Sequence, residues 1–306
     1  MAAREPSERP CPRKTKTWLM AAAITACATM TLSASDGRIP IGTVPYTITT
    51  SGSYYLTADF VYNSVSGAIT ISASGVDLDL NGHYIYQIST TLGAYCVYSS
   101  GYTNIKISNG KLFGGYSGIW LTSVGSGSIT VDHVTASFGL YGINLSGSGA
   151  TTAAMPTAQV TNNSVVLLQP SGQDCIHVQY FQNGLIASNT LAGGGTAGGT
   201  NGGGIVTFQA PALVIEGNTM TNSFYGIDTG DTGLQILKNT CRANYHGIAC
   251  FNATYVVVAE NSVTGNTGNG FYFQSVSGVY RNNLVQGNGT NYNIATSTIN
   301  NGGGNY

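Results

Sequence analysis

Few side chains in this sequence have the types and spacing that proton transfer requires. They fall in three short segments: Asp174 and His177 in QDCIHV, Asp228 and Asp231 in GIDTGD, and His246 in YHGI. A carboxylate or an imidazole held beside a substrate can act as a general acid or base. We therefore take these five as the candidate catalytic residues.

Two of the same acids could also bind a metal ion. Calcium prefers carboxylate oxygens, and Asp228 and Asp231 are close enough in sequence to share one ion. A further acidic segment, GVDLDLNGHYI at residues 75–85, matches the first half of an EF-hand loop, but Ile88 stands where that loop needs a glutamate. Its alternating apolar and acidic residues predict a strand and a turn instead. No cofactor is therefore certain, and calcium at Asp228 and Asp231 is the one candidate.

The composition limits the classes of protein to which the chain can belong. Only 8% of its 306 residues are charged and 42 are glycine, while 19 tyrosines and 9 phenylalanines argue against disorder. From Asp36 onward, six Lys and Arg stand against ten Asp and Glu, so the net charge is 6 − 10 = −4. Binding of nucleic acid is not expected, because it needs a basic surface. The low charge suits a neutral partner, or an anionic one bridged by a cation.

The N-terminal residues have the pattern of a secretory signal. Three basic residues precede an apolar run at residues 18–32, and small residues follow it. We interpret residues 1–35 as a signal peptide and expect a secreted or extracytoplasmic protein with no membrane span after its removal. The segment around Cys27 also resembles a lipoprotein signal, so lipid attachment at Cys27 is the alternative.

A repeat of about 22 residues defines the elements that must position the candidate side chains. A small residue followed by an apolar one recurs at Cys96-Val97, Gly118-Ile119, Gly142-Ile143, Cys175-Ile176, Gly204-Ile205, Gly226-Ile227, Gly247-Ile248, Gly270-Phe271 and Asn293-Ile294. Two asparagine series keep phase with this dyad, at Asn218, Asn239, Asn261 and Asn282 and at Asn222, Asn244, Asn266 and Asn288. Short apolar segments and abundant glycine at this period predict an all-β parallel β-helix with three short strands per coil.

The repeat also predicts the organisation of the chain. We expect one β-helix domain over residues 36–306, with about nine to ten coils, an N-terminal cap region at 36–65 and a C-terminal partial coil at 289–306. Inward aliphatic side chains should stack into a continuous core, and asparagines in equivalent turns should form hydrogen-bonded ladders.

The sequence resembles a known family at this level. Residues 226–266, GIDTGDTGLQILKNTCRANYHGIACFNATYVVVAENSVTGN, look like repeats of the right-handed parallel β-helix of the pectin-lyase-like superfamily. The stretch from SGSYYLTADF to DLDLNGHYI is similar to the first coil of its bacterial secreted members. The resemblance covers roughly residues 40–300. It implies this fold, and an active site along the outer face of the first strand of each coil.

Side chains on that strand alternate, so the residues just after and just before each dyad should point outward. These two columns mix aromatic rings with polar groups, as a sugar-binding groove needs. We take six of them as candidate substrate-binding residues: Tyr98, Trp120, Tyr141, Asn144, Tyr225 and Tyr272. His177 and Asp228 stand two coils apart in the first column, so their backbones should lie about 10 Å apart.

The candidate residues permit two kinds of reaction. Asp174 and Asp228 have a spacing near that with which inverting glycosidases admit a water molecule. A lyase would need a base, such as His177 or a tyrosine, and a calcium ion that neutralises a uronate. DCIHV resembles a segment of polygalacturonase-type hydrolases, which implies a catalytic role for Asp174. The chain departs from that family, because the paired aspartates and the Arg-x-Lys are missing, and the R-x-x-P of pectate lyases is absent too.

We therefore expect an exported β-helix protein that acts on a polysaccharide, as a lyase or a glycoside hydrolase. The alternative is a non-catalytic surface or carbohydrate-binding β-helix, in which the same residues are ordinary strand residues. The expected partner is a polysaccharide or a cell-surface glycan, and we expect a monomer.

Overall fold

The computed structural model describes residues 37–149, 155–169, 173–194 and 202–306. The expected signal peptide, with Cys27, lies outside these residues. In the part of the chain that is described, the regular elements are 31 strands and no helix, which confirms the all-β prediction. The same residues contain no helix long and apolar enough to cross a membrane.

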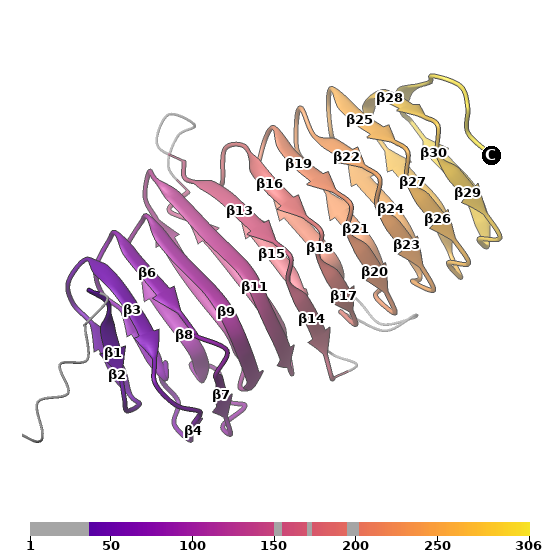
Figure 1. Ribbon diagram of the computed structural model, residues 1–306. Coiled ribbons are helices and arrows are strands. Elements are labelled where there is room, and N and C mark those ends of the chain that lie inside the picture. The colour runs from indigo at the N-terminus through magenta and orange to yellow at the C-terminus, as the bar shows by residue number, and fades with distance from the viewer. Residues whose placement is uncertain (1–36, 150–154, 170–172, 195–201) are drawn as a thin grey trace, which may run out of the picture. The chain divides into compact units, whose positions relative to one another are not determined.

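The strands of Arg38–Tyr306 form three rows along a parallel β-helix (Figure 1). One row is a separate sheet of eleven strands, which we call the site sheet. Its strands are β2 (Tyr46–Ile48), β5 (Ile69–Ile71), β8 (Tyr95–Ser100), β10 (Ser117–Val124), β12 (Tyr141–Gly147), β15 (Ile176–Gln179), β18 (Gly203–Phe208), β21 (Tyr225–Thr229), β24 (His246–Phe251), β27 (Asn269–Gln274) and β30 (Thr290–Ala295).

The other two rows belong to one sheet of twenty strands. The second row contains β1 (Ile39–Ile41), β3 (Gly52–Leu56), β6 (Val76–Asp79), β9 (Ile105–Gly114), β11 (Ser128–Phe138), β13 (Thr157–Thr161), β16 (Gly184–Ala187), β19 (Leu213–Glu216), β22 (Gln235–Leu237), β25 (Val256–Ala259), β28 (Ser277–Arg281) and β31 (Thr298–Asn301). The third row contains β4 (Phe60–Tyr62), β7 (Tyr84–Gln87), β14 (Ser164–Leu167), β17 (Thr190–Ala192), β20 (Thr219–Thr221), β23 (Thr240–Arg242), β26 (Ser262–Thr264) and β29 (Leu284–Gln286). The long strands β9 and β11 belong to both rows.

The dyads predicted from the sequence form the core side of the site sheet. Their apolar members pair coil by coil and are fully buried: Val97, Ile119, Ile143, Ile176, Ile205, Ile227, Ile248 and Phe271. The last predicted dyad is wrong, because Phe271 pairs with Tyr292 and not with Ile294. Residues two apart share one face of a strand, so Ile294 still occupies an inward position, one pair further along the strand.

Asparagine ladders run along the turns, as predicted. In the longer ladder, the backbone N–H and Nδ2 of each asparagine donate to Oδ1 of the next over 2.9–3.1 Å. Its members are Asn163, Asn189, Asn218, Asn239, Asn261, Asn283 and Asn305. A shorter ladder joins Ser223, Asn244, Asn266 and Asn288.

Two predicted ladder members are wrong. Asn282 and Asn222 lie one residue before the true members, Asn283 and Ser223. Both have positive φ angles, 54° and 57°, in the left-handed region that asparagine tolerates better than most residues. Asparagine therefore suits two adjacent positions of the turn for two different physical reasons.

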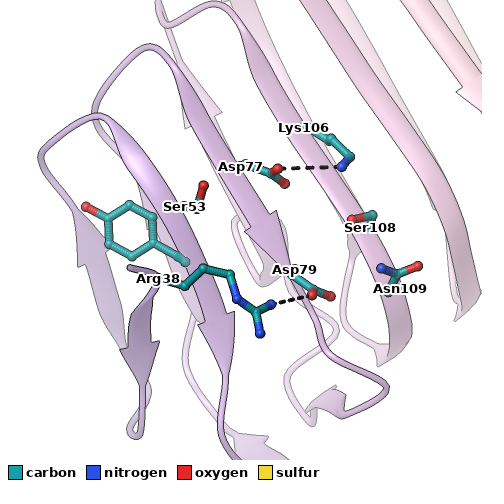
Figure 2. A pocket seen from close by; sticks show the side chains of 8 residues that line it. Arg38, Ser53, Asp77, Asp79, Lys106, Ser108 and Asn109 are labelled. Carbon is teal, nitrogen blue, oxygen red and sulfur yellow. Dashed lines mark hydrogen bonds and ion pairs between the residues drawn. The ribbon is translucent and has the colours of Figure 1, made fainter. Parts of the chain in front are cut away.

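The acidic segment GVDLDLNG forms strand β6 and a turn. Figure 2 shows Asp77 and Asp79 on β6 beside two basic side chains. Asp77 pairs with Lys106 at 3.5 Å, and Asp79 pairs with Arg38 at 2.8 Å. These matched charges favour a structural role for the two aspartates on this face of the second row.

Candidate active site

The outer face of the site sheet carries the candidate residues in the predicted column. Strand pairing aligns Tyr98, Trp120, Asn144, His177, Val206, Asp228, Ala249 and Tyr272. His177 on β15 and Asp228 on β21 are two strands apart, which corresponds to about 10 Å between their backbones. The small residue Val206 stands between them, so a ligand on this face can reach both groups.

Asp174 and His177 form a hydrogen-bonded pair. His177 Nδ1 donates to Asp174 Oδ2 over 2.8 Å, and the backbone N–H of Gly203 donates to Asp174 Oδ1 over 3.0 Å. Asp174 is only 6% exposed. Because both carboxylate oxygens are engaged, Asp174 orients the imidazole, and Nε2 of the neutral ring is left as the acceptor. Asp174 thus fixes the orientation of the His177 ring, and Nε2 is the ring nitrogen that could accept a proton.

Asp228 can carry a proton near neutral pH. Burial raises the pKa of this carboxyl to about 7, with a further contribution from the charges of Asp174 and Asp231. A carboxyl that holds its proton at such a pH can act as a general acid. By contrast, burial is the main cause that raises the pKa of both Tyr141 and Tyr225 to about 12. These phenols keep their protons, which favours His177 over either tyrosine as the base.

Asp231 lies beneath this face and is 3% exposed. It accepts hydrogen bonds from the Ala210 backbone N–H over 2.8 Å and from the Thr229 hydroxyl over 3.4 Å. The carboxylate therefore fixes the turn after β21 and acts on Asp228 through its charge. Among the described residues, no group of three or more His, Cys, Asp or Glu side chains could hold a metal ion. Asp228 and Asp231 alone supply fewer oxygens than calcium needs.

A first ring cluster lies on the N-terminal side of His177. Its members are Tyr95, Tyr98, Tyr116, Trp120 and Tyr141. The Tyr95 ring stacks on Tyr98 and Trp120 with centroids 5.3 and 5.4 Å apart, and Trp120 meets Tyr141 edge-on at 5.3 Å. Tyr141 contacts the His177 ring at 6.5 Å. An unbroken series of ring contacts therefore leads to His177.

A second ring cluster lies on the C-terminal side of Asp228. Tyr225, His246, Tyr272 and Phe251 form a closed circle, with successive centroids 5.3, 5.2, 5.2 and 6.1 Å apart. Ala249, which follows Asp228 in the outer column, is fully buried. The rings on the neighbouring positions account for this burial, so they meet above a small side chain.

His246 belongs to this second cluster and lies three strands from His177. The backbone N–H of Asn269 donates to His246 Nδ1 over 3.0 Å, so Nε2 carries the proton of the neutral ring. Burial lowers the pKa of this imidazole. The structure places His246 among the rings of this cluster, where it can donate a hydrogen bond, and away from the Asp174–His177 pair.

Three of the ring residues named above were not among the predicted site residues. Phe251 could have been found, because it stands two residues after Ala249 and so faces outward on the same strand. Tyr95 occupies the column before the dyad in β8, and the same argument applies to it. Tyr116 lies just before β10, where strand alternation gives no guidance.

The site sheet has no cationic side chain. None of its eleven described strands contains Lys or Arg. In the whole sequence, no Lys or Arg occurs between Lys111 and Lys238. Asp174, Asp228 and Asp231 therefore place three acidic groups near the centre of this face, where the strands offer no Lys or Arg and His177 pairs with Asp174.

Comparison with known proteins agrees with this fold. The family described as "Right handed beta helix region" matches residues 174–305. No curated protein matches the chain.

Several solved structures resemble this one, and two of them illustrate the likeness. A point mutant of the periplasmic alginate epimerase AlgG is 13% identical with a TM-score of 0.52, and the match covers 80% of this chain and 77% of AlgG. The enzymatically active domain of tailspike protein 2 from bacteriophage CBA120 is 16% identical with a TM-score of 0.50, and covers 79% of this chain and 41% of that domain. At this identity the likeness concerns the fold. The chain therefore has the fold of a right-handed parallel β-helix.

Proposed function

We propose that this protein is a glycoside hydrolase that binds an uncharged polysaccharide along the outer face of the site sheet. The observation that carries the proposal is the arrangement of His177 and Asp228. An imidazole oriented by Asp174 and a carboxyl with a pKa near 7 stand two strands apart, with Val206 between them. Their spacing of about 10 Å leaves room for a sugar and a water molecule.

The two groups can divide the reaction between them. His177 Nε2 accepts a proton from water while the water oxygen bonds to the anomeric carbon. The glycosidic C–O bond breaks, its electron pair stays on the leaving oxygen, and Asp228 donates its proton to that oxygen. Loss of the proton from His177 to solvent and reprotonation of Asp228 restore the resting state. Attack opposite to the leaving group predicts inversion at the anomeric carbon.

The charge of the face favours an uncharged substrate over a uronate. A uronate brings one carboxylate per residue, and a lyase must neutralise it before a base removes the adjacent proton. The site sheet has Asp228 on β21, with Asp174 just before β15 and Asp231 just after β21, and its described strands contain no Lys or Arg. A lyase reaction here would depend on an added cation such as calcium, which makes lyase activity the second candidate.

The two ring clusters support a long polymer as the substrate. Trp120 and Tyr272 are six strands apart in the outer column, which corresponds to about 29 Å. Rings on both sides of the proposed acid and base can pack against the apolar faces of several sugars. We also propose an extracytoplasmic location, a glycan partner and a monomeric state. The first two are consistent with the similar folds, which include a periplasmic protein and a phage protein.

A panel of polysaccharides tests this proposal. Neutral and uronate polymers should be incubated with and without calcium, and followed both by reducing ends and by the absorbance of unsaturated products. We expect new reducing ends from a neutral polymer, without absorbance and without need of calcium. Calcium-dependent absorbance from a uronate polymer would favour a lyase instead. Binding of a glycan without any product would favour the non-catalytic β-helix.

A further inference from the structure

Asn144 on β12 has a buried oxygen that no group in the described structure satisfies. The residue is 6% exposed and points outward, beside His177 on the next strand. Its Oδ1 is buried and has no hydrogen-bond partner. A buried acceptor without a donor costs about 1–3 kcal/mol, so such groups are rare unless a ligand or water supplies the donor.

Other buried asparagines of this protein show how unusual Asn144 is. Asn218 and Asn239, for example, have their Oδ1 atoms occupied by both the backbone N–H and the Nδ2 of the preceding ladder member. The fold can therefore satisfy a buried asparagine oxygen when the residue has a structural role. Among the described residues, Asp77 Oδ1 and the Tyr292 hydroxyl are also buried without a partner, but Asn144 Oδ1 is the unsatisfied asparagine oxygen and lies beside His177.

The neighbour of this oxygen is also an acceptor. Because His177 Nδ1 donates to Asp174, the neutral imidazole presents Nε2 as an acceptor. Neighbouring strands are about 4.8 Å apart, so Asn144 and His177 can reach one common donor. A water molecule has two O–H groups, whereas a sugar hydroxyl has one. One water molecule can satisfy both acceptors at once and still present a lone pair to the sugar, whereas one sugar hydroxyl can satisfy only one of them.

We propose that Asn144 is a positioning residue that holds the attacking water together with His177. This inference rests on the proposed hydrolase function. Water donates one hydrogen bond to Asn144 Oδ1 and the other to His177 Nε2, which takes that proton as the bond to the anomeric carbon forms. Asn144 itself exchanges no proton. Its contribution is to aim the water oxygen across Val206 toward the side on which Asp228 protonates the leaving group.

The test compares Asn144→Leu with the wild type on a neutral polysaccharide that the wild type cleaves. We expect kcat to fall at least about tenfold, because a misaimed nucleophile loses the benefit of orientation. We expect KM to change by less than about twofold, because the water is not part of the substrate, and the melting temperature to stay equal or rise, because leucine removes an unsatisfied polar atom. Asn293→Leu, in the same outer column next to Tyr272, is the matched control and should leave kcat unchanged.

Each other outcome overturns the inference in a recognisable way. A raised KM with unchanged kcat would mean that Asn144 contacts a sugar hydroxyl. A lower melting temperature with unchanged kcat of the folded fraction would mean a structural role. A wild type that cleaves no neutral polymer would overturn the proposed hydrolase, and the water-holding role with it. In the first two cases the wild-type activity stands, so the two failures are distinguishable.

Discussion

The asparagine ladder and the outer column of the site sheet run through the same coils but differ in what they repeat. From Asn163 to Asn305, the ladder places one residue type at each coil, and each asparagine in it donates to the next. The outer column changes from rings to amide, imidazole and carboxyl. It contains an unsatisfied oxygen on Asn144 and a carboxyl on Asp228 that its surroundings destabilise when charged.

This difference distinguishes the positions of the repeat that stabilise the fold from the positions that could bind a ligand. Where a position recurs unchanged, its hydrogen bonds are complete and it stabilises the stack. Where the repeat breaks, polar groups are left in environments that are unfavourable without a ligand. Such groups persist only when the rest of the fold is stable enough to hold them, and they are often found at functional sites.

The largest expected effect is on turnover, and it compares two Asp–His pairs that lie on different sheets. His177→Gln removes the basic nitrogen of the site sheet, and turnover should fall by about 10²–10⁴-fold because a general base contributes that much. His133 on β11 pairs with Asp132 at 2.7 Å and provides a matched control, since it belongs to the larger sheet. Initial rates of His177→Gln and His133→Gln on the same polymer measure the difference. Equal losses would show that position on the site sheet does not matter.

The next effect concerns the ladder. Asn239→Ala leaves the N–H and Nδ2 of Asn218 without their acceptor, and also removes the two bonds that Asn239 Nδ2 donates to Asn261 Oδ1 and to the Ile215 carbonyl. We expect a loss of about 2–4 kcal/mol in the free energy of unfolding, because buried donors are left unsatisfied. Chemical denaturation measures it, with Asn222→Ala as the control, because Asn222 is exposed and stands outside the ladder. A control that loses as much would contradict the assigned register.

A smaller change in the free energy of unfolding, of opposite sign, is expected when Asp228 is replaced. Its pKa of about 7 in the folded protein exceeds that of an unfolded aspartate, so the folded state binds the proton more tightly. Stability of the wild type should therefore fall as pH rises from about 4 to about 7, and Asp228→Asn should remove this loss. We expect the variant to be about 1–3 kcal/mol more stable at pH 8 and equal near pH 4. Thermal unfolding of both proteins between pH 4 and pH 8 measures this difference in stability. A variant that is less stable than the wild type at pH 8 would mean that the folded protein stabilises the charged carboxylate of Asp228.

Much of the architecture could be predicted from the sequence because it rests on local rules. The Gly-Ile and Cys-Ile dyads gave the register of β10 to β27 and hence the outer column, since strand alternation needs no knowledge of distant residues. The same rules failed at Asn222, Asn282 and Asn293, where one residue type suits two adjacent or alternate positions. Strand patterns alone do not show which of two nearby asparagine positions belongs to the ladder or to the dyad, because that depends on the lengths of the neighbouring coils.

The environment of the site residues could not be predicted in the same way. The raised pKa of Asp228 depends mainly on its burial and further on the charges of Asp174, which lies two coils earlier, and of Asp231 in the same coil. From the sequence alone, Asp228→Asn is expected to change stability by less than about 1 kcal/mol, because an outward strand residue contributes little to the core. The structure replaces that expectation, since the carboxyl is partly buried. His246 likewise looks catalytic in sequence but packs among rings.

The most direct test of the proposed acid–base pair is the pH dependence of turnover in the wild type and in Asp228→Asn. The wild type should lose activity as pH rises through about 7, because Asp228 then gives up the proton that the leaving oxygen needs. Asp228→Asn should be slower by about 10²-fold or more at pH 6 and should lack this alkaline limb. An Asp228→Asn variant that cleaves the polymer at the wild-type rate, with the same fall above pH 7, would contradict the account.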